Sequence, residues 1–133
     1  MDCMHASVSS VLVLAATSTG RTRIADILRD AGMGVIEASR GDEALDLARD
    51  RRPELIVTDL GLSDLDGDEF TLALRTDPAT RGTPVLFCGE RHDERELWRL
   101  ASECGVARVL VKPYAPEELM QAIGELFTRS PPP

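Results

Sequence analysis

The feature that most constrains the fold of this chain is a set of five short apolar runs, each followed by a helical pattern. Each run is too short for a helix, and apolar residues recur every three to four positions after it. Continuously apolar runs are typical of parallel strands that are buried on both faces. The chain therefore predicts an α/β fold with a doubly wound, five-stranded parallel sheet. The expected strands are residues 11–15, 35–38, 55–59, 85–88 and 109–111.

Length and pattern favour a single domain. The 133 residues provide one hydrophobic core and leave no room for a second. We expect the domain to span residues 10–128. Residues 1–9 and the proline-rich tail 129–133 have no periodic pattern, and we expect both to be flexible.

Charge and cysteine content limit the partners and the location. The net charge is −8, so we expect no binding to nucleic acid or to anionic membranes. No apolar run approaches the roughly 20 residues that span a bilayer. The three cysteines are odd in number and lack metal-ligand spacing, which argues against a disulfide framework. These observations favour a cytoplasmic protein.

Two charged residues mark one edge of the predicted sheet. Asp59 ends the third apolar run and Lys112 follows the fifth. In an open parallel sheet, reactive groups gather at the carboxyl ends of the strands. A carboxylate at the end of a buried strand is costly unless it meets a cation or a polar cleft. The two residues are either separate solvated charges or parts of one site, in which we expect them to form an ion pair.

Three segments resemble, in order, those of response regulator receiver domains, the CheY-like family. Residues 57–67 resemble the segment after their third strand, which places the phospho-acceptor at Asp59. Val111-Lys112-Pro113-Tyr114 resembles their Lys-Pro-aromatic signature, and residues 41–45 resemble the start of their second helix. The resemblance implies strand order 2-1-3-4-5 and a cis Lys112–Pro113 peptide. It also implies a partner-binding face formed by the fourth helix, fifth strand and fifth helix.

The chain departs from this family at four positions. Receiver domains hold Mg²⁺ with two adjacent acidic residues where this chain has Ala15 and Ala16. Gly89 stands at their threonine or serine position, and Val109 at their switch aromatic. Phosphoryl transfer depends on charge neutralisation, which the metal normally supplies. The resemblance therefore implies an atypical, degenerate receiver with no cofactor, weak or absent Mg²⁺ binding, and impaired or absent phosphorylation.

Two further residues are candidates for the site and its surroundings. Arg91 lies two residues beyond Gly89, at a position that borders the acceptor in the family. It is either a second cation near Asp59 or a solvated surface charge. Trp98 lies beside the inward face of a helical pattern, where it either anchors a partner or covers its own core.

We expect a stand-alone receiver in two-component signalling that is not an enzyme. Its partner is expected to be a histidine kinase or a downstream effector, and the domain to be a monomer or a weak homodimer. One alternative is a conventional receiver that a histidine kinase still phosphorylates on Asp59.

An alternative of another class is an FMN-binding, flavodoxin-like protein. Residues 17–22 match the Thr-x-Thr-Gly-x-Thr phosphate loop of flavodoxins, although the same residues suit an ordinary helix cap. Aromatic residues, which stack on the flavin in that family, make up only 4% of this chain.

Overall fold

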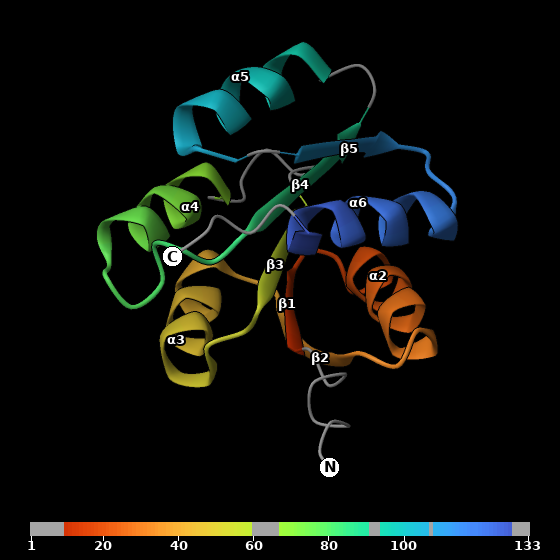
Figure 1. Ribbon diagram of the computed structural model, residues 1–133, viewed down its shortest axis with the longest axis horizontal. Coiled ribbons are helices and arrows are strands. Elements are labelled where there is room, and N and C mark those ends of the chain that lie inside the picture. The colour runs from red at the N-terminus through yellow and green to blue at the C-terminus, as the bar shows by residue number, and fades with distance from the viewer. Residues whose placement is uncertain (1–9, 60–66, 91–93, 107, 129–133) are drawn as a thin grey trace.

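The computed structural model describes residues 10–59, 67–90, 94–106 and 108–128 (Figure 1). Strands and helices alternate along these residues, as the five apolar runs predict. The strands are β1 (Ser10–Leu14), β2 (Gly34–Ala38), β3 (Leu55–Asp59), β4 (Val85–Glu90) and β5 (Arg108–Lys112). The helices are α2 (Ser18–Asp30), α3 (Gly41–Arg51), α4 (Gly67–Thr76), α5 (Glu94–Cys104) and α6 (Pro116–Thr128). No helix in these ranges is long and apolar enough to cross a membrane.

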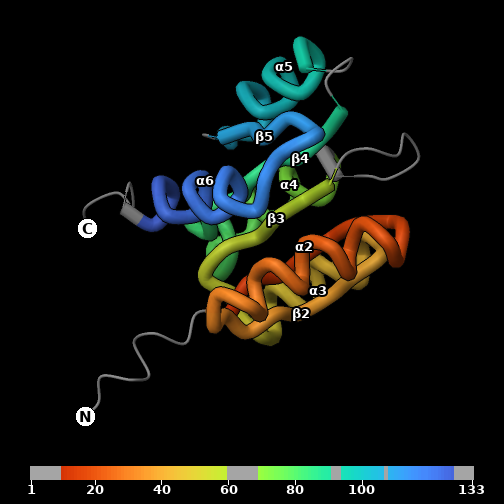
Figure 2. The backbone as a smooth tube through the Cα atoms, turned by 90° about the vertical axis from the view of Figure 1, so that its right-hand side faces the viewer, coloured from red at the N-terminus to blue at the C-terminus, as the bar shows by residue number. Residues whose placement is uncertain are grey.

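All neighbouring strands pair in parallel, in the order β2-β1-β3-β4-β5, which confirms the predicted fold and strand order. Successive side chains of a strand point to opposite faces, so each buried strand supplies two apolar layers. Figures 1 and 2 show α2 and α6 on one face of the sheet, and α3, α4 and α5 on the other. The first layer includes Val13, Val57, Leu86 and Leu110, and the second includes Leu12, Ile56, Phe87 and Val109.

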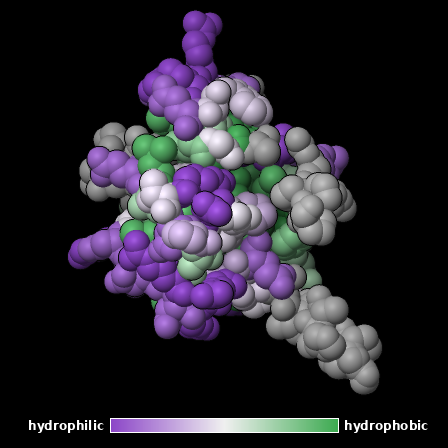
Figure 3. Space-filling view, turned by 60° about the vertical axis from the view of Figure 1, so that its left-hand side comes forward, coloured by the Kyte–Doolittle hydropathy of each residue, from purple (hydrophilic) through white to green (hydrophobic). Residues whose placement is uncertain are grey.

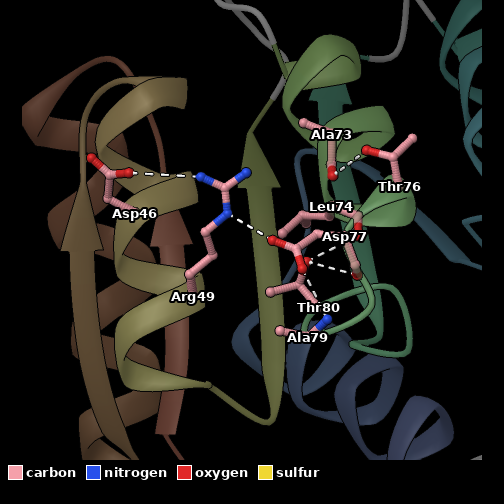
Figure 4. Close-up of polar contacts among 8 residues, drawn as sticks. All are labelled: Asp46, Arg49, Ala73, Leu74, Thr76, Asp77, Ala79 and Thr80. Atoms are coloured by element: carbon pink, nitrogen blue, oxygen red, sulfur yellow. Dashed lines mark hydrogen bonds and ion pairs between the residues drawn. The ribbon is translucent and has the colours of Figure 1, made fainter.

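Polar contacts fix the connection between α4 and β4 (Figure 4). Arg49 Nε of α3 donates to Asp77 Oδ2 at 2.8 Å, and Asp77 Oδ1 accepts from the Ala79 amide at 2.9 Å. The buried Thr80 hydroxyl donates to the Leu74 carbonyl at 2.9 Å, which satisfies an acceptor at the end of α4. The connection is therefore held to both α3 and α4.

Arg75 extends this anchoring to α5. Its guanidinium donates to the carbonyls of Thr83 at 2.8 Å, Arg81 at 3.1 Å and Cys104 at 3.3 Å. Burial lowers the pKa of Arg75, although a guanidinium stays protonated in proteins at neutral pH. The charge lies against the carboxyl-terminal end of α5, where a cation is favourable. The ends of α4 and α5 are thus joined next to the start of β4.

Candidate functional site

The site lies at the carboxyl ends of β3, β4 and β5. Strand register places Asp59 opposite Cys88, and Glu90 opposite Lys112. Lys112 Nζ donates to Asp59 Oδ2 at 2.8 Å and to Oδ1 at 3.0 Å. The side chain of Asp59 is 9% exposed and that of Lys112 is 27% exposed. The ion pair that the sequence predicts is therefore present, and its carboxylate is largely shielded from water.

Glu90 brings a second carboxylate to the same lysine. Its Oε2 lies 3.9 Å from Lys112 Nζ, and its side chain is 44% exposed. Glu90 was not among the site residues predicted from the sequence. The available signal was its place directly after Gly89, at the end of a buried strand. Lys112 thus contacts two carboxylates, the buried Asp59 at hydrogen-bond distance and the more exposed Glu90 at a longer distance.

The first turn of α2 approaches Asp59 closely. Thr17 caps this helix, and its Oγ1 accepts from the Gly20 amide at 3.1 Å. A Cβ at Gly20 would lie 3.3 Å from Asp59 Oδ2, so glycine permits this approach. The positive end of the helix dipole favours the negative charge on Asp59. Within residues 17–22, the structure therefore shows the helix cap that was the alternative to a phosphate loop.

A cavity of about 330 Å³ adjoins the ion pair. The residues beside it include Thr19 and Arg23 of α2 together with Asp59, Lys112 and Tyr114. The peptide bond between Lys112 and Pro113 is cis, as the resemblance implied. The cavity is large enough for a small anion or for several water molecules.

The end of β1 provides no carboxylate. Ala15 is buried, and its carbonyl accepts from Arg21 Nη1 at 2.9 Å. Arg21 Nε also lies 3.6 Å from Glu37 Oε1, so a guanidinium is held at this edge. Arg21 was not among the site residues predicted from the sequence, in which its one signal was its position one helical turn after Thr17.

These residues do not fit a Mg²⁺ site. Magnesium requires near-octahedral oxygen ligation, usually with one or two carboxylates and several waters. Here both oxygens of Asp59 accept from an ammonium group, while Ala15 and Ala16 have no donor side chain. Over the described ranges, no group of three or more His, Cys, Asp or Glu side chains is placed to hold a metal ion.

Gly89 and Val109 lie on the face of the sheet that α5 covers. A Cβ at Gly89 would lie 2.6 Å from both methyl carbons of Leu97, so the leucine occupies the space beside this glycine. Val109 is buried in the same cluster as Leu97. Neither position places a polar side chain near Asp59.

Comparison with known proteins identifies the family. The family model of the response regulator receiver domain matches residues 11–124. The chain belongs to the receiver family. This receiver is 28% identical over 118 residues to the probable chemotaxis protein CheY of Rhizobium etli, and the match covers 88% of this chain and 91% of the relative. It is also 28% identical over 119 residues to the polar-differentiation response regulator DivK of Brucella anthropi, covering 87% of this chain and 97% of the relative.

Solved structures agree with this assignment. A putative response regulator from Chloroflexus aurantiacus has a TM-score of 0.84 and 26% identity, and the match covers 92% of this receiver and 99% of that chain. The chemotaxis protein CheY4 of Vibrio cholerae has a TM-score of 0.81 and 28% identity, over 90% of this receiver and 98% of that chain. The receiver assignment places the protein in two-component signalling, and the flavodoxin alternative is not favoured.

Two protonated groups lie beside the ion pair of this receiver: Cys88, which pairs with Asp59 across the strands, and Tyr114, which lines the same cavity. Burial, and next the charge of Asp59, raise the pKa of the Cys88 thiol to about 12. Burial, and next the neighbouring Cys88 thiol, raise the pKa of Tyr114. Both groups therefore stay protonated at neutral pH. Cys88 and Cys104 are both buried, and neither forms a disulfide within the described residues.

The outer surface of this receiver has few large apolar side chains. Figure 3 shows mostly hydrophilic residues on the side where α3, α4 and α5 lie. Among the residues with described side chains, the exposed large hydrophobic ones are Trp98, at 45% exposure, and Leu72, at 47%. Trp98 is thus partly exposed on α5, whereas Arg91 falls outside the described residues.

Proposed function

We propose that this receiver signals by contact with a protein partner. We further propose that Asp59 stays paired with Lys112 instead of accepting phosphate in a metal-assisted transfer. The observation that carries the proposal is that Lys112 Nζ donates to both oxygens of Asp59. Receiver domains interact with histidine kinases and effectors, so the partner belongs to one of these two kinds. We expect a cytoplasmic location, no catalytic activity, and a monomer or weak homodimer.

The charge distribution supports this proposal. Attack on a phosphodonor requires a carboxylate oxygen free to act as nucleophile, and a cation that neutralises the incoming phosphoryl group. At the receiver's metal positions, Ala15 and Ala16 contribute no charge. The hydroxyl that would donate to the phosphoryl group is replaced by Gly89, and loss of one such donor costs roughly 10²–10³ in rate in other enzymes. Phosphorylation of Asp59 is therefore expected to be slow.

Incubation with acetyl phosphate and Mg²⁺ tests the proposal. The wild type should carry no more acid-stable, hydroxylamine-sensitive phosphate than the Asp59→Asn variant, as measured by intact-protein mass spectrometry. A second variant, Ala15→Asp/Ala16→Asp, restores the two acids and is the matched positive control. Stoichiometric labelling of the wild type that Asp59→Asn abolishes would contradict the proposal.

The conventional receiver is the second candidate function. The 330 Å³ cavity supports it, because Thr19 and Lys112 border a space next to Asp59 that could hold a phosphoryl group. A kinase would then have to supply the missing charge neutralisation. This candidate predicts that a captured, phosphorylated histidine kinase transfers phosphate to the wild type and not to Asp59→Asn, even where acetyl phosphate fails.

Trp98 is our candidate anchor for the partner. Large aromatic side chains at partly exposed positions often dominate the binding energy of an interface. Affinity capture with the wild type and with Trp98→Ala tests this role. A receiver-specific kinase or effector that is captured equally by both forms would exclude Trp98 as an anchor.

A further inference from the structure

Leu97 of α5 fills the space in which a side chain at residue 89 would lie. A Cβ built on Gly89 would be 2.6 Å from Leu97 Cδ1, 2.6 Å from Cδ2 and 3.1 Å from Cγ. Both terminal methyls and the branching carbon are involved, so a small rotation of one methyl would not relieve the overlap. With Leu97 and α5 in these positions, there is no room for a Cβ at residue 89.

Neither partner in this contact has room to move. Gly89 lies on β4, which is paired with β3 on one side and β5 on the other. Leu97 is 2% exposed and packs in one cluster with Phe87, Ala101 and Val109. Protein interiors are close-packed, so an added carbon must displace a neighbour. Because Gly89 is paired with Val111 of β5, a larger residue 89 has to displace Leu97 or the helix α5 that carries it.

We infer that the Gly89–Leu97 contact sets the position of α5 on the sheet, and with it the position of Trp98. This position does not depend on whether Asp59 is charged or paired with Lys112. Leu97 is thus a positioning residue for the exposed surface of α5. Asp59 lies two residues beyond Val57 on β3, so it shares the face of the sheet that α2 and α6 cover. Gly89 contacts α5 on the opposite face. The inference goes beyond the proposed function, because it concerns the placement of a helix and not the chemistry of the acceptor.

A double-mutant cycle on stability tests the contact. Gly89→Ala should lower the equilibrium constant for folding by about 30-fold, because it forces overpacking of the core. In a Leu97→Ala background the same change should lower it by less than about threefold, because the obstructing side chain is gone. Gly124→Ala is the matched control: its Cβ would meet nothing within 4 Å, and the constant should not fall.

Each outcome of this cycle either supports or overturns the role of Leu97. Equal losses from Gly89→Ala in both backgrounds would overturn the inference. If Gly89→Ala alone does not fold, the Gly89→Ala/Leu97→Ala double variant decides: a folded double variant supports Leu97 as the obstacle, and an unfolded one overturns it.

Fluorescence provides a readout of helix position rather than stability. Trp98 is the single tryptophan of the chain, so its emission reports on α5 alone. Asp59→Asn and Lys112→Met should leave the emission maximum and the acrylamide quenching of Trp98 unchanged. A shift in either variant would show that α5 follows the state of Asp59, and would overturn the inference.

Discussion

Removing the charge of Lys112 should destabilise the fold through Asp59. The Lys112→Met variant keeps most of the apolar stem and deletes the ammonium that donates to both oxygens of Asp59. The carboxylate, which is 9% exposed, then stays in its buried position without its cation. The expected loss of stability comes mainly from this uncompensated charge.

The structure sets the size of the loss. Breaking a fully buried ion pair costs about 3–5 kcal/mol, and an exposed pair contributes about 0–1 kcal/mol. Coulomb attraction over the contacts of 2.8 and 3.0 Å, at an effective dielectric constant near 20, gives about 6 kcal/mol as an upper bound. Because Lys112 is 27% exposed and a cavity adjoins the pair, we expect an intermediate value of about 2 kcal/mol for Lys112→Met.

A double-mutant cycle isolates the interaction from the loss of packing. In an Asp59→Asn background, Lys112→Met should cost less than about 1 kcal/mol, so that the coupling energy is at least about 1 kcal/mol. Glu90 is the complicating partner, because its carboxylate lies 3.9 Å from the same ammonium. Repeating the cycle with Glu90→Gln removes this second attraction.

Urea unfolding at neutral pH, followed by far-ultraviolet circular dichroism, measures the four variants of each cycle. Additive effects of independent sites agree within about 0.5 kcal/mol. A coupling energy below that limit in both cycles would refute the argument, because the two groups would then not stabilise each other in solution.

Three further predictions follow from the site and from the α4–β4 connection. Millimolar Mg²⁺ should leave the melting temperature and the Trp98 emission unchanged, since the donor set does not fit the ion; a saturable shift with submillimolar affinity would contradict this. Hydrogen bonds from the Ala79 amide and Arg49 hold the pKa of Asp77 below its ordinary value of 3.8. The stability gained from this charge is present above that value and is lost as pH falls through the lower, folded-state pKa. The stability difference between wild type and Asp77→Asn should therefore shrink as urea unfolding is repeated from about pH 5 towards about pH 2, and a constant difference would argue against it. Iodoacetamide should leave Cys88 unmodified in the native protein at neutral pH and modify it in urea, because burial keeps the thiol protonated. Rapid labelling of Cys88 in the native protein, detected by mass spectrometry of its peptide, would contradict this prediction.

The sequence was sufficient to predict the sheet and its central ion pair. Short continuous apolar runs that alternate with helical patterns are typical of parallel strands covered on both faces, and the carboxyl ends of such strands meet at one edge. Asp59 and Lys112 could therefore be brought together without coordinates. Glu90 could not, because its distance to Lys112 depends on the register between β4 and β5.

Contacts that depend on how far a side chain extends could not be predicted from the sequence either. Arg21 donates to a backbone carbonyl, and any long side chain in the first turn of α2 is a candidate for that role. Leu97 is predicted as a core residue by its helical spacing. Its overlap with a Cβ at Gly89, however, depends on the distance between α5 and β4, which periodicity does not determine.

The pairing of Gly89 with Leu97 also affects how this receiver can change by single substitutions. Position 89 is where the resemblance places a threonine or serine, so regaining that hydroxyl requires a Cβ in space that Leu97 now occupies. Changing residue 89 first creates a steric clash, and shortening Leu97 to alanine first opens a cavity that costs about 2–5 kcal/mol. Both single steps pass through a less stable protein. A hydroxyl at residue 89 is therefore hard to reach by single substitutions, because packing opposes either order of change.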